Sequence, residues 1–552
     1  MLSQIYTSAF IGINILDISV QVHLANGVPA FNIVGLANKA VSEAKERVRA
    51  SLSYLGITLP AKRITINLSP SDITKEGNHY DLPIALCLLS GLGIVPVDEL
   101  SEFSAMGELS LNGDVNPVAG VLPSAIYAMG KGRSFICPSA NLEEAGFATT
   151  GEKILPAGNL LDLINHFKGN NIIDFLKPSD IATKNKEQNH HQNYPNFSEI
   201  KGQAVAKRAS EIAATGGHNM LLSGPPGSGK TMIARAMLGI LPKLTGQEML
   251  NISMINSIAG VIKEEGLRLA RPFRDPHHNC SMPAMVGGGV KASPGEVTLA
   301  DNGILFLDEL PEFSRQVLDS LRQPLETGSV TIARANSHIN YPANFQLIAA
   351  QNPCRCGHLG TATKECSKAP ICGQDYQAKL SGPLLDRIDL FVNVKALMPE
   401  EIYNEDKRIK QEETSEEITQ RVQNAREIQK QRYERYLQNM AKDIAPQAGS
   451  AITDIGVDAN MHVNKTQQDL YQTRDSFIVN ARADGDFLKA ITPMQDDAKD
   501  LLIKGMRSLS LSMRGHNRIL RLARTIADLA ESEVIEKSHI AEALSYRNML
   551  QS

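Results

Sequence analysis

Hydrophobic and polar residues follow different periods in successive parts of the chain, and these periods predict its secondary structure. Residues 63–68 alternate as a half-buried strand does. A helical stripe precedes them, and residues 107–115 predict a hairpin around Asn112-Gly113. Residues 1–170 are therefore expected to form one domain of mixed strands and helices. The stripe consists of Val41, Ala44, Val48, Leu52 and Leu55.

Two other patterns follow along the chain. In the region 197–397, the apolar run at 219–223 leads through a glycine-rich loop into a helical pattern over 232–241. This order of strand, loop and helix is typical of an α/β module with a parallel sheet. From about residue 398 helix signals dominate, starting with a capping box at Thr414 and Glu417. The region 398–552 is therefore expected to be a helical lid domain.

The boundaries between these parts follow from composition. Residues 182–196 are polar and show no period, so a linker is expected over 171–196. Residues 441–459 are mixed in composition and contain Pro446, Gly449 and Gly456. We expect an insertion around 441–494 inside the helical domain.

Composition excludes several classes of protein. The chain has 552 residues, 56 Lys and Arg against 60 Asp and Glu, and a net charge of −4, so any contact with nucleic acid must come from a local patch. The longest apolar run, 82–97, is interrupted by Pro and Gly and is shorter than the ~20 residues that a spanning helix needs. Seven cysteines do not suit a secreted disulfide framework. A soluble, cytoplasmic protein with no membrane partner is expected.

The glycine-rich loop carries the strongest chemical signal. It reads Gly224-Pro225-Pro226-Gly227-Ser228-Gly229-Lys230-Thr231 and lies between a predicted strand and a predicted helix. Glycines allow backbone N–H groups to turn toward phosphate oxygens, and the helix N-terminus adds its dipole. Lys230 is expected to reach the β- and γ-phosphates, and the Thr231 hydroxyl to bind Mg²⁺. The sequence therefore predicts an ATP site.

A second nucleotide signal lies downstream. Residues 303–307 form an apolar run that ends in Asp308 and Glu309. A buried strand of this kind delivers its acids to the carboxyl end of the sheet, where α/β sheets bind ligands. Asp308 is placed to hold Mg²⁺ through water, and Glu309 to orient or deprotonate the attacking water.

Further motifs make the chain resemble a known family. They include 349–353 (Ala-Ala-Gln-Asn-Pro), 381–389 (Ser-Gly-Pro-Leu-Leu-Asp-Arg-Ile-Asp), 512–514 (Ser-Met-Arg), 271–278 (Arg-Pro-Phe-Arg-Asp-Pro-His-His) and 294–296 (Pro-Gly-Glu). Their order along the chain resembles that of an AAA+ ATPase, and their residues resemble those of the ComM/YifB family of magnesium-chelatase-like proteins. The resemblance extends to 47–50, 75–83 and 524–529, and so covers nearly the whole chain.

The resemblance implies roles for three more residues. Asn352 matches the polar sensor of the γ-phosphate or attacking water, Arg387 the arginine finger that completes a neighbour's site, and Arg514 the second sensor on the lid. A finger supplied in trans implies a ring, and the family suggests a homo-hexamer. For Arg387 the alternative is a surface ion pair with Asp386 or Asp389.

Four cysteines form a cluster between the sensor and the finger. Cys354, Cys356, Cys366 and Cys372 lie within nineteen residues, and four thiols can surround a tetrahedral zinc ion. A structural zinc that braces this loop is expected. Reduced thiols that cluster without a metal are the alternative.

Two predicted hairpins carry candidate DNA contacts. In related ATPases such hairpins project into the pore, and here they span 286–293 and 330–339, with Lys291 and Arg334 near their tips. A ring would turn each cation into a basic collar that could hold phosphates. Solvated surface side chains are the alternative.

The N-terminal region resembles the fold of Lon protease but lacks its catalytic pair. Where that family has serine and lysine, this chain has residues 75–81 (Lys-Glu-Gly-Asn-His-Tyr-Asp) and 119–122 (Ala-Gly-Val-Leu). A Ser–Lys dyad needs both residues, because the hydroxyl is a poor nucleophile without a base. A binding or ring-organising platform is therefore expected.

The resemblance implies a Mg²⁺-dependent hexameric ATPase that translocates on single-stranded and branched DNA. By likeness to ComM it would drive branch migration during natural transformation, with recombination proteins as candidate partners. A magnesium-chelatase-type motor subunit acting on a protein partner is the first alternative. A non-catalytic scaffold is the second, although it would need none of the nucleotide motifs.

Overall fold

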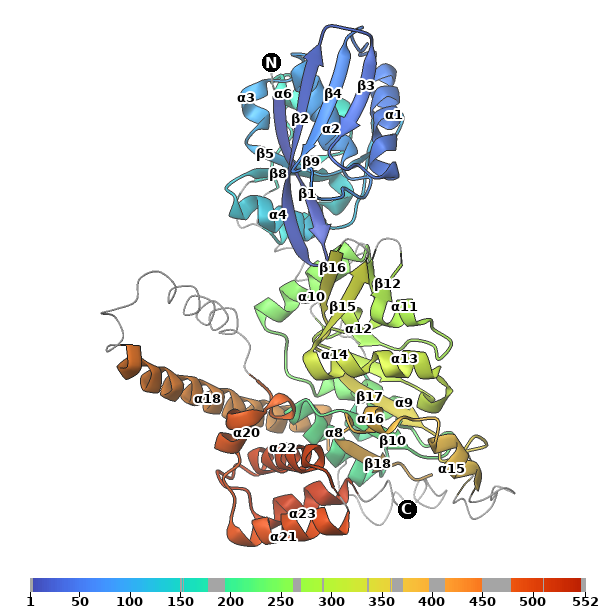
Figure 1. Cartoon of the computed structure of the whole chain (residues 1–552), viewed down its shortest axis with the longest axis vertical. Helices are drawn as coiled ribbons and strands as arrows, with labels where there is room; N and C mark the ends of the chain where they lie inside the picture. The colour runs from blue at the N-terminus through green and yellow to red at the C-terminus, as the bar shows by residue number, and fades with distance from the viewer. Residues whose placement is uncertain are drawn as a thin grey trace.

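The computed structural model describes three regions joined along the chain, as Figure 1 shows from blue to red. The description covers residues 3–148, 151, 153–176, 194–261, 270–289, 292–334, 337–357, 359, 371–396, 413–448, 478–509 and 511–547. The chain is mixed α/β, as predicted, with an N-terminal sheet domain, a parallel five-stranded sheet and a C-terminal helical region. Most of the predicted linker lies outside the described residues.

The N-terminal domain is built on a seven-stranded sheet of order β3-β4-β2-β1-β5-β8-β9. The predicted strand at 63–68 is β4, and the predicted stripe lies on α1, where Val41, Ala44, Val48 and Leu52 are fully buried. The expected hairpin is formed by β6 and β7. Residues 82–91 of the apolar run 82–97 lie in the buried helix α2. The bounds are β1 Ser3–Ile11, β2 Asn14–Ala25, β3 Ala30–Val34, β4 Arg63–Ser69, β5 Phe103–Ala105, β6 Glu108–Leu109, β7 Val115–Asn116, β8 Ser134–Pro138, β9 Ile154–Ala157, α1 Lys39–Tyr54, α2 Asp81–Gly91, α3 Val97–Leu100, α4 Val121–Gly130, α5 Leu142–Gly146 and α6 Leu160–Phe167.

The central module contains a parallel sheet of order β11-β14-β17-β10-β18. β10, β14 and β17 are buried on both faces, whereas the edge strand β11 is only partly buried. Met220 and Leu222 of β10 pack into one core, which reaches the C-terminal helices, whereas Leu221 packs into the other. The bounds are β10 Met220–Ser223, β11 Phe273–Arg274, β14 Ile304–Leu307, β17 Gln346–Gln351, β18 Leu390–Asn393, α8 Ala204–Gly216, α9 Lys230–Ala236, α10 Gly246–Ile258, α11 Met282–Val286, α12 Glu296–Leu299, α13 Arg315–Ser320, α14 Arg322–Thr327, α15 Ile371–Gln377 and α16 Gly382–Leu385.

Two short hairpins extend from the central module where the sequence predicts them. β12 Gly287–Gly288 pairs with β13 Ser293–Pro294, and β15 Ser329–Arg334 pairs with β16 Ser337–Pro342. In Figure 1 both hairpins lie on the side of the module that faces the N-terminal domain. That domain contacts β16 through the β1–β2 turn, because a Cβ on Gly12 would meet the Asn340 oxygen at 2.9 Å. A second contact joins the Gly120 N–H to the Ser257 carbonyl of α10 at 3.1 Å.

The helical region packs against the central module through α18 and α22. The predicted capping box begins α18, because the Thr414 N–H donates to Glu417 at 2.8 Å and the Glu417 N–H donates to the Thr414 hydroxyl at 3.3 Å. The helix continues to Ala448, past the expected start of the insertion. The described residues 478–491 form η5 and α20, and Ala483 and Leu488 join the main core. The bounds are α18 Ser415–Ala448, η5 Asn480–Arg482, α20 Gly485–Ile491, α21 Asp496–Ser508, α22 Met513–Leu529 and α23 Lys537–Ser545. Within the described residues, no helix has the length and apolarity that crossing a bilayer requires.

Candidate ATP site

The glycine-rich loop joins β10 to α9, and its glycines are required by close packing and by backbone shape. A Cβ on Gly224 would lie 2.2 Å from the Val394 carbonyl oxygen, so a larger residue cannot fit there without moving β18. Gly227 and Gly229 have φ of 76° and 88°, which favour glycine. The Ser228 hydroxyl is buried and has no hydrogen-bond partner within the described structure. These features fit a loop that wraps an anion.

Lys230, the first residue of α9, turns its ammonium back onto this loop. Its Nζ donates to the Gly224 carbonyl at 2.8 Å, to the Pro225 carbonyl at 2.9 Å and to Asn352 Oδ1 at 3.2 Å. Burial lowers the pKa of Lys230, and the charges of Asp308 and Glu309 oppose that effect. The ammonium is therefore held by carbonyl and amide oxygens that phosphate oxygens could replace.

Thr231, which follows Lys230, contacts the second nucleotide motif. Thr231 Oγ1 donates to Asp308 Oδ2 at 3.2 Å, just beyond the carboxyl end of β14. A hydroxyl beside a carboxylate at this position suits an octahedral Mg²⁺ that also binds phosphate. Burial and then the charge of Asp308 raise the pKa of Asp275, and the charge of Arg235 opposes that effect. Glu309 follows with φ 52°, a left-handed conformation that is uncommon outside glycine.

The sheet order explains why these residues meet. β17 lies between β10 and β14, so the loop after β10, Asp308 after β14 and Asn352 after β17 share one edge. Carboxyl ends of parallel strands are where such sheets bind ligands. The structure therefore joins Lys230, Thr231, Asp308 and Asn352 in one set of contacts, and the residues present fit ATP with Mg²⁺.

Arg387 lies elsewhere and is held by its own chain. Its guanidinium donates to the Pro383 carbonyl at 2.7 Å, to the Arg322 carbonyl at 3.1 Å and to Glu326 at 2.5 Å. The alternative to a finger was an ion pair of Arg387 with Asp386 or Asp389. Arg387 does form an ion pair, but its partner is Glu326. Asp386 pairs with Arg518, and Asp389 pairs with His218. No described contact joins Arg387 to the ATP site of its own chain.

Arg514 occupies the second position of α22 and is exposed. One turn further along this helix, Arg518 is only 6% exposed, and its Nη2 lies 3.3 Å from Asp386 Oδ1. Arg518 Nη1 is buried without a hydrogen-bond partner in the described structure. Arg518 and Arg524 are the buried arginines of α22, and Arg514, the residue that the motif predicts, is not one of them.

The cysteine loop packs on the glycine-rich loop. Cys354 Sγ and Cys356 Sγ lie 3.2 Å apart, and a Cβ on Gly357 would meet Pro226 at 2.6 Å. Cys372 lies on α15, and Cys366 lies outside the described residues. Among the described residues, no group of three or more His, Cys, Asp or Glu side chains could hold a metal ion.

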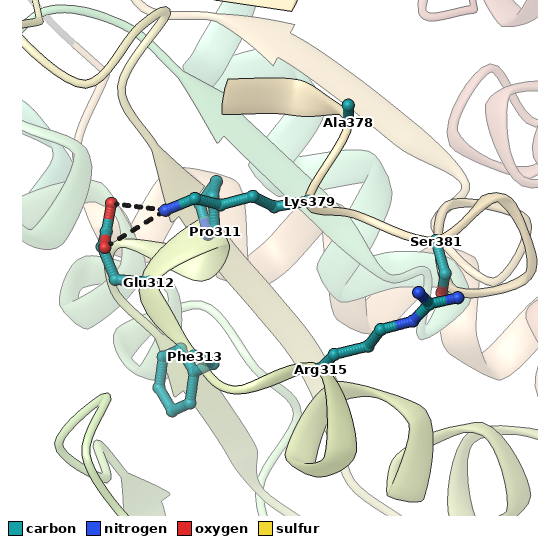
Figure 2. A pocket seen from close by; sticks show the side chains of 7 residues that line it. All are labelled: Pro311, Glu312, Phe313, Arg315, Ala378, Lys379 and Ser381. Carbon is teal, nitrogen blue, oxygen red and sulfur yellow. Dashed lines mark hydrogen bonds and ion pairs between the residues drawn. The ribbon is translucent and has the colours of Figure 1, made fainter. Parts of the chain in front are cut away.

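A cavity of about 380 Å³ lies beside the turn that follows Glu309. Figure 2 shows Lys379 reaching across it to Glu312, at 3.3 Å, and Arg315 extending toward Ser381. None of the residues of the glycine-rich loop lines this cavity, so it is separate from the phosphate cradle. It is lined by Pro311, Glu312, Phe313, Arg315, Ala378, Lys379 and Ser381.

The candidate DNA contacts are only partly described. Lys291 lies outside the described residues, between β12 and β13. For Arg334 the structure gives the backbone, which pairs with Ser337 at the end of β15. Sequence reasoning quoted Asp275 and His278 in a motif but gave them no role. Their position just after a strand was the signal that could have placed them at the sheet edge.

Comparison with known proteins finds family models that match almost the whole chain. The model for magnesium chelatase, subunit ChlI, matches residues 196–402. The model for subunit ChlI of Mg-chelatase matches residues 20–141, and that for the ChlI C-terminal region matches residues 412–547.

Two of the similar proteins match over nearly their full lengths, and a third matches over half of its own. YifB of Escherichia coli is 38% identical over 99% of this chain and 97% of its own length. The competence protein ComM of Haemophilus influenzae is 37% identical over 100% of this chain and 98% of its own. The magnesium-chelatase 38 kDa subunit of Rhodobacter capsulatus is 29% identical over 28% of this chain and 50% of its own.

We predict that Gly224→Ala weakens ATP binding by at least about tenfold, or ~1.4 kcal/mol, because the new Cβ would collide with the Val394 oxygen and distort the loop. Titration with a fluorescent ATP analogue measures the effect. Gly246→Ala is the matched control, because a Cβ there meets no atom within 4 Å. Equal affinity in both variants would contradict the role given to the loop.

Proposed function

The chain belongs to the magnesium-chelatase ChlI-like family of AAA ATPases, together with YifB and ComM, and on this premise we propose that it is a ring-forming ATPase that moves along DNA. The family implies ATP hydrolysis with Mg²⁺. The proposal adds a homo-hexamer, translocation on single-stranded and branched DNA, and branch migration during integration of transforming DNA. The full-length similarity to the competence protein ComM is the observation that carries it.

The contacts at the sheet edge support separate roles in ATP binding and hydrolysis for the residues of one subunit. When ATP and Mg²⁺ bind, they supply the phosphoryl group and its charge neutralisation. Lys230 would exchange its carbonyl partners for phosphate oxygens, and Thr231 and Asp308 would hold the cation. Asn352, bonded to Lys230, would sense the γ-phosphate, and Glu309 would orient the attacking water.

A magnesium-chelatase-type motor that acts on a protein partner is the competing proposal. The magnesium-chelatase subunit of Rhodobacter capsulatus corresponds to only 28% of this chain, whereas ComM corresponds to all of it. Similarity over the full length therefore favours the ComM-like function.

The arginine finger makes the ring testable. We predict that Arg387→Ala keeps ATP affinity but lowers turnover by about 10³-fold or more, the loss typical of removing a finger. Glu326→Ala is the matched control, because it removes the intrachain ion pair and leaves the guanidinium. Turnover is measured by phosphate release.

Mixing experiments separate a finger from a structural arginine. Subunits carrying Lys230→Ala retain the finger, and subunits carrying Arg387→Ala retain the ATP cradle. A mixture should recover turnover at sites shared between the two kinds of subunit. Full activity of Arg387→Ala alone, or no recovery on mixing, would argue against a ring with shared sites.

The two hairpins make the DNA contact testable. We predict that the double variant Lys291→Ala, Arg334→Ala loses DNA stimulation of ATP hydrolysis while basal turnover stays within about twofold, because the proposed cationic collar is removed and the residues of the ATP cradle are unchanged. Hydrolysis is measured with and without single-stranded and branched DNA. Stimulation that is unchanged in the double variant would contradict the collar.

We further propose a structural zinc bound by Cys354, Cys356, Cys366 and Cys372. The short distance between the first two sulfur atoms is consistent with both binding one metal ion. Because Gly357 packs on Pro226, a metal ion in this loop would also stabilise the glycine-rich loop. We predict about one zinc per chain by elemental analysis of the purified protein, and its loss in Cys354→Ser. Protein without zinc would refute the site.

A further inference from the structure

The strands β1 and β2 project from the N-terminal sheet toward the central module. In the described sheet, residues 8–11 of β1 pair only with residues 14–17 of β2, because the pairs with β5 and β4 lie nearer the other ends of these strands. The root of this two-stranded ribbon is held by Arg133, which donates two hydrogen bonds of 2.8 Å to Asp17. The tip of the ribbon therefore keeps a defined position relative to its own domain.

The tip of the ribbon contacts the β15–β16 hairpin. A Cβ on Gly12 would lie 2.9 Å from both the Asn340 oxygen and Ile339 Cγ2. On either side of Gly12, Ile11 and Ile13 pack against the apolar core that includes Ile339. Figure 1 shows this end of β1 and β2 beside β16. The position of the hairpin is therefore set in part by the N-terminal domain.

A second contact joins the N-terminal domain to the end of α10. The Gly120 N–H donates to the Ser257 carbonyl at 3.1 Å, and the Ser257 hydroxyl donates to Glu144. Glu144 is only 7% exposed and accepts two hydrogen bonds within its own domain, from the Leu122 N–H at 3.1 Å and from Asn141 at 3.0 Å. A buried carboxyl group needs such donors, because burying a polar group without hydrogen bonds costs free energy. Ser257 is therefore a specific anchor for the N-terminal domain.

The two contacts are connected within the N-terminal domain. Phe10, near the tip of the ribbon, packs so closely on Gly120 that a Cβ on Gly120 would collide with its ring. At the other end of α10, Glu248 pairs with Arg271 at 3.2 Å. Arg271 also donates to the Asn302 carbonyl at 2.7 Å, just before β14. The N-terminal domain consequently bridges the hairpin and a helix that is held to the ATPase sheet.

We propose that the N-terminal domain is a brace that positions the β15–β16 hairpin: Ser257 and Glu144 hold the domain on α10, and the turn at Gly12 holds the hairpin. These three are then positioning residues, because they act through the hairpin and not on the nucleotide. The brace itself rests on the described contacts. Its expected control of DNA-stimulated ATP hydrolysis rests on the proposed function.

Hydrogen exchange of the full-length protein, measured by mass spectrometry on the two strands of the hairpin, tests the brace without DNA. Ser257→Ala should speed exchange there by roughly two- to tenfold, the range expected from the loss of one hydrogen bond. None of the described hydrogen bonds of Ser257 is made with the hairpin, so the effect must pass through the N-terminal domain. Ser253→Ala is the matched control, because this serine is also buried on α10 and donates to the Met249 carbonyl of the same helix. Exchange as slow in Ser257→Ala as in the wild type would refute the brace.

The turn of the ribbon gives a second variant. Gly12→Ala should speed the same exchange, because the new Cβ would collide with Ile339 and Asn340. Gly56→Ala is the matched control: Gly56 has φ 74°, close to the 66° of Gly12, but a Cβ there meets no atom within 4 Å. Equal exchange of the hairpin in these two variants would remove the role given to the turn.

A disulfide across the same interface separates loss of docking from damage to the fold. A Cβ on Gly260 would lie 3.7 Å from the Ala119 Cβ, within the roughly 3.5–4.5 Å that a disulfide spans. Both residues are exposed. Ala119→Cys with Gly260→Cys, in the Ser257→Ala background, should therefore form a disulfide on oxidation, slow the exchange of the hairpin toward the wild-type rate, and lose this rescue on reduction.

Ser257→Ala without the added cysteines, oxidised in the same way, is the control for the native cysteines. A disulfide that forms without slowing the exchange would overturn the brace. Failure of the disulfide to form would contradict the docking of α10 on this surface.

ATP hydrolysis with and without a single-stranded oligonucleotide separates the inference from the proposed function. Ser257→Ala should lower the DNA-stimulated kcat by about two- to thirtyfold, the range over which residues outside ligand sites modulate coupling, with the KM for ATP within about twofold. If the wild type is not stimulated by DNA, the proposed function is wrong, and the exchange experiments still decide the brace. If the wild type and Ser257→Ala are stimulated equally although the hairpin of the variant exchanges faster, the control of hydrolysis by the brace is wrong and the proposed function stands.

Discussion

Parallel pairing of β10, β17 and β14 is the constraint on which the rest of the structure depends. The register pairs Ser223 with Gln351 and Leu307 with Ala349, so the three strands end together. A shift of one residue would move every side chain into the opposite apolar core, where it would not fit the side chains already packed there. The close packing of the two cores therefore favours this register, and the register brings Lys230, Asp308 and Asn352 to one place although they are far apart in sequence.

The sequence predicted those parts of the site that local signals encode. The glycine-rich loop needs positive φ and a close approach to Val394, and only glycine gives both, so the loop could be found from residue types alone. The contact of Arg387 with Glu326 could not be found in this way, because the two residues lie on different elements and meet only after α14 and α16 pack. The burial of Arg518 was missed for the same reason. Arg514 matches the motif, whereas Arg518 is the residue of α22 that pairs with Asp386 once the helix packs against the central module.

The ion pair between Arg387 and Glu326 bears on how a ring would work. Glu326 is 57% exposed, so the pair is worth little more than a surface salt bridge, about 0–1 kcal/mol. A transferring phosphoryl group in a dry subunit boundary offers a guanidinium a much stronger partner. If Arg387 is the finger that we propose, breaking its pair with Glu326 would therefore cost little when a neighbouring subunit with bound nucleotide approaches.

The segment that carries Arg387 is also bound to the lid. His218 contacts Asp389 at 3.2 Å and Thr525 of α22 at 2.8 Å, and both contacts are buried. Burial alone would raise the pKa of Asp389, but the hydrogen bond from His218 and the charges of Arg547 and Arg518 outweigh it and lower that pKa. Asp389 is therefore ionised and fully paired, and separating it from these partners would leave a buried charge, which costs several kcal/mol. Arg518 and Arg547 belong to the helical region, and His218 of the central module hydrogen-bonds Thr525 of α22, so a rotation of α22 must either break these contacts or move residues 386–389. If Arg387 is the finger that we propose, its position would therefore follow any movement of the helical region of its own subunit.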